Sequence, residues 1–148
     1  MTLNTSGGNN GDLYAYLSFD GTVVTLLNRP GTQDNPLGFM DAGYNVTVED
    51  GGADGNLNLA TGGSPVTGAY SPDAGSFSDF TGSPNGTWTL FVADLSGGDT
   101  GPDSQLNSWY LTINDTTVPE PITCGLIVFA MLGAAVRLAG RRLRRKIA

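Results

Sequence analysis

The acidic residues of this chain are the side chains best suited to chemistry, because several of them fall in loops rich in glycine. Asp94 ends a segment of β-type composition, and Asp99 and Asp103 lie in the loop that follows it. Asp12 stands just before another such segment. Carboxylate and carbonyl oxygens are the ligands that calcium takes. We therefore predict a calcium site formed by Asp94, Asp99, Asp103 and Asp12, although aspartate also suits ordinary turns.

The scarcity of histidine and cysteine excludes several kinds of catalytic and metal site. The chain has no histidine and a single cysteine, Cys124. Without histidine it forms no Ser-His-Asp or Cys-His hydrolase site and no histidine-ligated zinc site of its own. With one cysteine it forms no internal disulfide and no cysteine-cluster metal site. We therefore expect no catalytic residue in this chain and no cofactor other than calcium.

The charges divide the chain into two parts. Its 148 residues carry a net charge of −7, and 22 of them are glycine, which is typical of a loop-rich all-β domain. Residues 1–118 hold thirteen acidic residues and one base, Arg29, for a net charge of −12. Residues 119–148 carry +5. An acidic body repels phosphate, so nucleic acid is not an expected partner.

The basic part begins with an apolar stretch that has the length of a membrane span. Residues 122–140 contain no charge before Arg137. A helix of that length would span roughly 28 Å, close to the thickness of a bilayer core. The basic residues after it would stop transfer and stay in the cytoplasm, which places the acidic body across the membrane. These stop residues are Arg141, Arg142, Arg144, Arg145 and Lys146.

The residues just before this stretch complete a recognisable order. Val118, Pro119, Glu120 and Pro121 precede the apolar run, and the arginine-rich terminus follows it. This order resembles the PEP-CTERM sorting signal of proteins exported by Gram-negative bacteria. The resemblance implies that an exosortase, a membrane-bound processing enzyme, recognises residues 118–121 and cuts near them. It places the protein in the inner membrane with one span, or at the cell surface or in the matrix after processing.

Short β-type segments fill the rest of the chain. Leu13, Ala15, Leu17 and Phe19 alternate with more polar residues, and Asp20-Gly21 predicts a hairpin turn after them. Residues 50–65 read as irregular, anchored by Leu57 and Leu59. Many short strands with regular turns predict an all-β, jelly-roll-like β-sandwich. The expected strands cover residues 12–19, 22–27, 44–49, 66–70, 87–94 and 106–114.

The order of the motifs in this body carries a second resemblance. The block GDL is followed by TLLNRPG, and later by NGTWTL, VAD, GDTG, LNSW and LTI. This order resembles the P domain, also called the Homo B domain, of subtilisin-like proprotein convertases, over about residues 1–114. In that family the domain stabilises a separate serine endopeptidase domain and supplies no catalytic residue. The resemblance therefore implies an association with proteolysis but no activity in this chain.

The N-terminus departs from both resemblances. The segment MTLNTSGGNNGDLYAYL has neither the basic start nor the apolar stretch of a signal peptide. The family domain also normally has a further strand before the GDL block. We therefore expect the true N-terminus to lie upstream, and the sandwich as given to lack an N-terminal strand and to expose an unpaired edge.

These features leave three functions open. The first is a non-catalytic exported module that acts in adhesion, matrix association or protein binding, with exopolysaccharide or surface proteins as partners. The second is the stabilising C-terminal part of a larger subtilisin-like serine endopeptidase. The third is a carbohydrate-binding sandwich that uses Trp88 and Trp109, although an alternating strand position favours core packing for both rings.

The predicted organisation has four parts. They are the P-domain-like sandwich at 1–114, a linker with the Val-Pro-Glu-Pro motif at 115–121, a transmembrane helix at 122–140, and a basic cytoplasmic tail at 141–148.

Overall fold

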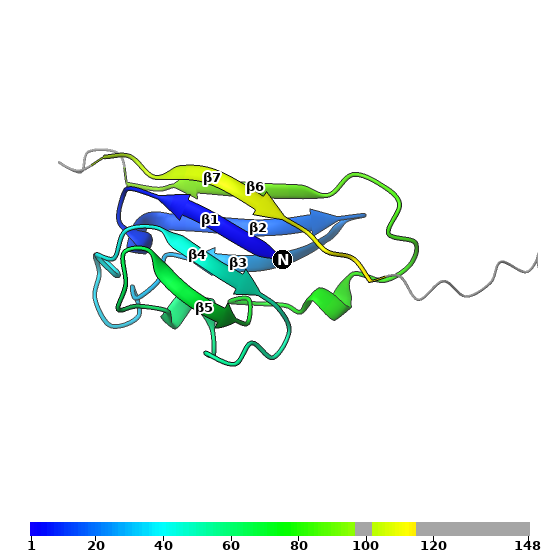
Figure 1. The fold of residues 1–148 in the computed structure, drawn as a ribbon, viewed down its shortest axis with the longest axis horizontal. Coiled ribbons are helices and arrows are strands. Elements are labelled where there is room, and N and C mark those ends of the chain that lie inside the picture. The colour runs from blue at the N-terminus through cyan, green and yellow to red at the C-terminus, as the bar shows by residue number, and fades with distance from the viewer. Residues whose placement is uncertain (97–101, 115–148) are drawn as a thin grey trace, which may run out of the picture. The chain divides into compact units, whose positions relative to one another are not determined.

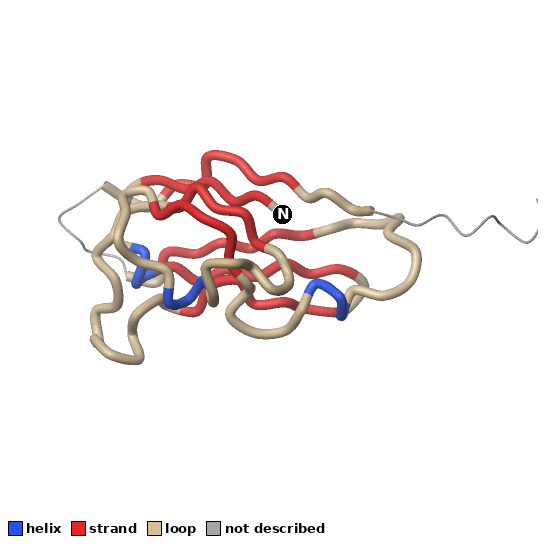
Figure 2. The backbone as a smooth tube through the Cα atoms, turned by 60° about the horizontal axis from the view of Figure 1, so that its bottom comes forward, coloured by secondary structure: helices blue, strands red, loops and turns tan. Residues whose placement is uncertain are grey.

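The computed structural model describes residues 1–96 and 102–114. The predicted linker from residue 115 on, the membrane helix and the basic tail lie outside the described residues. Within the described ranges no helix has the length and apolar character needed to cross a bilayer. Strands and loops make up most of this part, with short 3₁₀ turns between them (Figure 2).

The described strands form two sheets that pack as a sandwich (Figure 1). One sheet has the order β5-β4-β1-β7 and the other the order β3-β2-β6. This arrangement confirms the predicted all-β sandwich. The strands are β1 (Thr2–Ser6), β2 (Leu13–Phe19), β3 (Thr22–Asn28), β4 (Tyr44–Val48), β5 (Val66–Tyr70), β6 (Thr89–Asp94) and β7 (Gln105–Tyr110), and the 3₁₀ turns are η1 (Asn10–Asp12), η2 (Leu57–Leu59) and η3 (Phe77–Asp79).

The β2–β3 hairpin forms where the sequence predicts it. Asp20 and Gly21 both have positive φ, 46° and 80°, as a two-residue hairpin turn requires. The register pairs Phe19 with Thr22 and shifts at a bulge beside Ala15. A bulge places an extra residue in one strand. As a result Leu26 and Leu27, which are neighbours in β3, are both fully buried.

The core follows the alternation of the strands. Leu13, Ala15, Leu17 and Phe19 are buried, and the residues between them are more exposed. In β4 the buried residues are Tyr44, Val46 and Val48. The predicted face of β2 is therefore confirmed, and β4 follows the same rule, because period-two alternation assigns one set of side chains to the interior.

Three details differ from the sequence analysis. Residues 2–6 form β1, which pairs with β4 on one side and β7 on the other, so the expectation that the sandwich lacks an N-terminal strand and exposes an unpaired edge in its place is wrong. Strands β6 and β7 are shorter than the predicted 87–94 and 106–114. Leu57 is an anchor, as predicted, but Leu59 is 56% exposed, because in η2 it lies on the side opposite the core.

One flank of the sandwich is covered by segments that belong to neither sheet. The outer edge of β3 pairs with residue 74: Thr25 and Ala74 exchange N–H···O bonds of 2.9 and 3.1 Å. Beyond β5, the Asp54 N–H donates to the Ala69 carbonyl at 2.8 Å. Turn η2 fills the space between, and its Leu57 side chain is fully buried. We call this side, formed by β3, β5 and η2, the closed flank.

A buried amide ties η2 to β3. The Asn58 side chain accepts a hydrogen bond from the Asn28 N–H at 2.8 Å and donates one to the Asn28 carbonyl at 3.2 Å. The Asn56 side chain caps the turn by accepting from the Asn58 N–H at 2.7 Å. These bonds satisfy backbone groups that would otherwise be unpaired at a sheet edge.

Candidate functional site

The opposite flank is not closed in this way. Strands β6 and β7 are the last strands of their sheets, and both lie along the same side of the sandwich (Figure 1). Among the described residues, no strand pairs with the outer edge of either one. We call this side, formed by β6 and β7, the open flank.

Side chains that face the interior at the open flank are only partly covered. Leu90 and Val92 of β6 pair across the sheet with the fully buried Leu17 and Ala15. Leu106 of β7 pairs with the buried Thr5, yet Leu106 is 43% exposed. Since side chains opposite each other share a face, these residues point inward but reach solvent through the flank.

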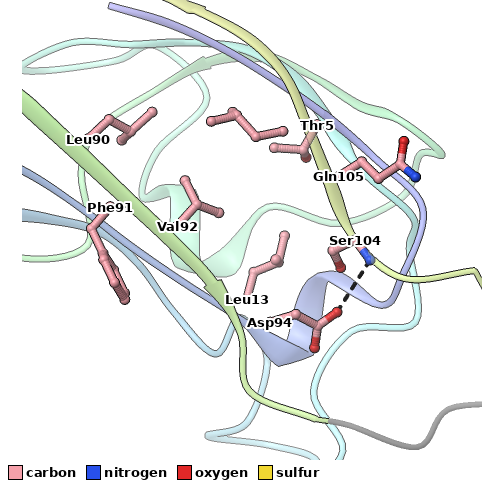
Figure 3. Close-up of a pocket in the computed structure, with 9 residues that line it drawn as sticks. Thr5, Leu13, Leu90, Phe91, Val92, Asp94, Ser104 and Gln105 are labelled. Atoms are coloured by element: carbon pink, nitrogen blue, oxygen red, sulfur yellow. Dashed lines mark hydrogen bonds between the residues drawn. The ribbon is translucent and has the colours of Figure 1, made fainter.

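A cavity of about 300 Å³ lies between the two edges. Its walls include Leu90 and Val92 on one side and Leu106 on the other, with Leu13 and Thr5 also lining it. Figure 3 shows Val92 pointing towards this space and Phe91 pointing away from it. The cavity is therefore an opening of the sandwich core between two unpaired strand edges.

Asp94 lines one end of the cavity, and the backbone of a second predicted calcium ligand, Asp12, lies next to it. The Leu95 N–H donates to the Asp12 carbonyl at 2.8 Å, so Asp12 lies beside the end of β6, where Asp94 stands. The Asp94 carboxylate accepts a hydrogen bond from the Ser96 N–H at 3.1 Å. It accepts another from the Ser104 N–H at 3.4 Å, which Figure 3 shows as a dashed line. Asp94 thereby links the two ends of the loop between β6 and β7.

These bonds affect the acidity of Asp94. Desolvation alone would raise the pKa of its carboxyl. Hydrogen bonds from Ser104 and Ser96 stabilise the charged form and outweigh desolvation, so the pKa lies below its ordinary value. Asp94 is therefore a carboxylate at neutral pH, as a calcium ligand has to be.

The other predicted ligands do not complete a metal site in this part of the chain. The buried Asp12 carboxylate faces the Arg29 guanidinium at 3.9 Å, a cation that would compete with a metal. Asp103 is exposed, and its carbonyl oxygen packs against the backbone of Gly7. Asp99 lies outside the described residues. Across residues 1–96 and 102–114, no three acidic, histidine or cysteine side chains group as a metal site. Calcium binding stays a prediction that depends on Asp99.

The predicted sorting and membrane residues lie beyond the described part. They are Val118, Pro119, Glu120 and Pro121 of the motif, and the basic residues from Arg141 to Lys146.

The tryptophans are engaged with other rings or with the core. Trp88 stacks on Phe19 with 4.1 Å between ring centroids and meets Phe80 edge-on at 5.0 Å. Its indole N–H donates to the Pro84 carbonyl at 3.1 Å. Trp109 is partly buried against the core from β7. Ring contacts and a hydrogen bond therefore support packing for Trp88, although it lies just before β6 and not in a strand as predicted, and partial burial supports packing for Trp109.

Sequence reasoning missed the open flank. Neither β6 (TLFVAD) nor β7 (QLNSWY) contains lysine, arginine or proline, the residues that usually protect exposed edge strands. The other five described strands lack these residues too, so this feature does not distinguish the open flank from the closed one. The open flank follows from the order of the strands in the two sheets, which no local sequence pattern records.

Comparison of the chain with protein-family models, with curated proteins and with solved structures finds no match.

Proposed function

We propose that this protein is a non-catalytic surface module of the P-domain type, exported and held at the bacterial envelope by a PEP-CTERM signal. The body would be a jelly-roll-like sandwich, and residues 122–140 would form the single membrane span. Its role would be protein binding, adhesion or matrix association on the outer side of the inner membrane or at the cell surface.

The observation that carries this proposal is the order of features at the C-terminus. Val118–Pro121, an apolar stretch of membrane length and a basic cluster follow one another without interruption. The sharp change from a net charge of −12 to one of +5 at this point suits a body and a tail on opposite sides of a membrane.

A binding role, rather than a catalytic one, fits the chemistry of the chain. A serine or cysteine nucleophile needs an adjacent base or a lowered pKa, and no histidine is present to serve as that base. The open flank offers apolar side chains and unpaired strand edges instead of an acid–base pair.

The test is the intact mass and the terminal peptides of the native protein from its producing cells. We expect a product cut near residues 118–121 and recovered with the envelope or the matrix. A Pro119→Ala, Pro121→Ala double variant should remain uncut, and Pro84→Ala serves as a control distant from the motif. An uncut wild-type chain in the cytoplasm would contradict the proposal. A product with an upstream protease domain would make the chain the stabilising part of an enzyme.

A further inference from the structure

The open flank presents two kinds of unsatisfied surface at once. The outer edges of β6 and β7 carry backbone N–H and C=O groups that no described strand pairs with. Between them, the cavity exposes Leu90, Val92 and Leu106 from the inward side of the sheets. A small ligand could fill the cavity but would leave the backbone edges unpaired. An extended peptide would satisfy both, because a strand carries backbone groups along its edge and side chains towards the core.

Several exposed apolar residues lie on or next to β6 and β7. Leu106, which lines the cavity, is 43% exposed, and Leu95, directly after β6, is 56% exposed. Phe91 is 42% exposed as well, but it points away from the cavity and stacks on Tyr16 (Figure 3). The apolar surface that the flank offers to an occupant is therefore the cavity wall with its exposed Leu106.

The closed flank shows what an occupant has to supply. There the chain closes the gap with backbone bonds to the neighbouring edges and with one large side chain, Leu57, which is fully buried. An occupant of the open flank would likewise pair with an edge and insert apolar side chains at alternate positions.

Charge indicates which kind of peptide fits. The open flank ends at Asp94, which accepts a hydrogen bond from Ser104. The exposed Asp103 directly precedes Ser104 in the sequence. Residues 1–118 carry −12 in total, so a second copy of this body would be repelled. A segment with lysine or arginine on its outward side would be attracted.

We propose that the open flank binds an extended segment of another protein as an added β-strand, and that this segment is apolar on alternate residues and basic on the others. The proposal rests on the binding role proposed above and names its surface and partner. It requires neither export nor anchoring, so the two can fail separately.

The experiment measures binding of synthetic peptides to the purified full chain in mild detergent. The probe is a peptide of about eight residues, a usual strand length, that alternates valine and lysine. A valine–glutamate peptide tests the charge requirement. A valine–lysine peptide with central prolines keeps the charge but cannot pair along an edge. We expect saturable binding of the first peptide only, with slowed amide exchange in β6 or β7.

Two variants of equal charge locate the site. Leu106→Lys places a cation at the cavity and should weaken binding by about tenfold or more. Val23→Lys on β3, at a residue that is 54% exposed, should leave binding unchanged. Melting temperatures without peptide verify that both variants fold.

Several results would overturn the proposal. One is equal binding of the pairing and the proline-containing peptides; another is equal loss in both variants. Protection of β6 and β7 in the absence of peptide would show that the flank is already covered. Its dependence on concentration would identify a second copy as the cover, and its independence would identify a segment of the native product itself.

Discussion

The two flanks of this sandwich differ in how the gap between the sheet edges is covered. At the closed flank, η2 inserts Leu57 and the Asn58 amide bonds to β3, so that edge and core are both sealed. At the open flank, inward-facing Leu106 stays 43% exposed and a cavity of about 300 Å³ remains. A two-sheet core therefore does not determine by itself how its edges are covered. Coverage depends on the segments between the strands, and those that the structure describes cover the flank formed by β3 and β5.

The largest expected effect is a difference in unfolding free energy between removing a leucine from the closed flank and removing one from the open flank. Leu57→Ala deletes a fully buried side chain and should lower the free energy of unfolding by about 2–5 kcal/mol. Leu106→Ala removes the same atoms from a half-exposed position and should cost about 1 kcal/mol or less. Denaturant unfolding of the full chain and both variants measures the difference. Equal losses would contradict the distinction between the flanks.

Removal of the Asn58 amide, which bonds to the backbone of Asn28 in β3, should cause the next largest loss of stability. Asn58→Ala leaves the N–H and the carbonyl of Asn28 without their side-chain partner in a part-buried place, and should cost about 1–3 kcal/mol. Asn107→Ala is the matched control at the open flank, since its amide makes solvent-exposed hydrogen bonds with the Asn4 side chain and the Ser6 hydroxyl. We expect it to be close to neutral in the same unfolding experiment. A neutral Asn58 variant would show that this amide does not seal the flank.

Calcium should raise the stability of the chain through Asp94, at the end of the open flank. If Asp94 and Asp99 bind the ion together, calcium at tenfold excess over its dissociation constant should stabilise the chain by about 1.4 kcal/mol. The thermal midpoint of the wild type should then rise, and that of an Asp99→Asn variant should not. Asp79→Asn, which alters a carboxylate that caps η3, is the control. An unchanged wild-type midpoint would remove calcium from the account.

The smallest expected effect is a dependence of stability on pH, to which the carboxyls of Asp50 and Asp94 contribute. Desolvation opposes the charge of Asp50, but hydrogen bonds from Ser76, Phe77 and Ser78 hold its pKa below the ordinary value, as Ser104 and Ser96 do for Asp94. A carboxyl with a lowered folded-state pKa stabilises the fold above its unfolded pKa of about 3.9, and this contribution is lost as pH falls through the folded-state value.

Both carboxyls are exposed, so solvent screening keeps each contribution under about 1 kcal/mol. Asp50→Asn and Asp94→Asn should each reduce the loss of stability below pH 4. Thermal melting at a series of acid pH values measures this loss. An acid limb identical to that of the wild type in both variants would contradict the roles given to these hydrogen bonds.

Local patterns predicted the parts of the fold that depend on local physics. The alternation of Leu13 to Phe19 identified the buried face of β2, and Asp20-Gly21 identified the hairpin turn. Strand β1 was missed because Thr2–Ser6 is short and polar, and its strand conformation depends on pairing with both β4 and β7. That pairing joins residues far apart in sequence, which no local pattern records.

The candidate site was predicted in part for the same reason. Sequence placed Asp94 at the end of a strand and Asp12 before one, and the antiparallel pairing of β2 with β6 brings their backbones next to each other. It could not predict that Arg29 would face Asp12, because this contact depends on the turn after β3. The open flank itself follows from sheet order, which only the assembled strands define.

The central claim is that one flank is sealed and the other open, and amide hydrogen exchange of the full chain tests it most directly. We predict that the Thr25 amide, bonded to the Ala74 carbonyl, exchanges slowly. Alternate amides along the outer edges of β6 and β7 should exchange far faster, because no strand within residues 1–96 and 102–114 pairs with these edges. Equal protection of all these amides would contradict the account and show that the flank is already covered.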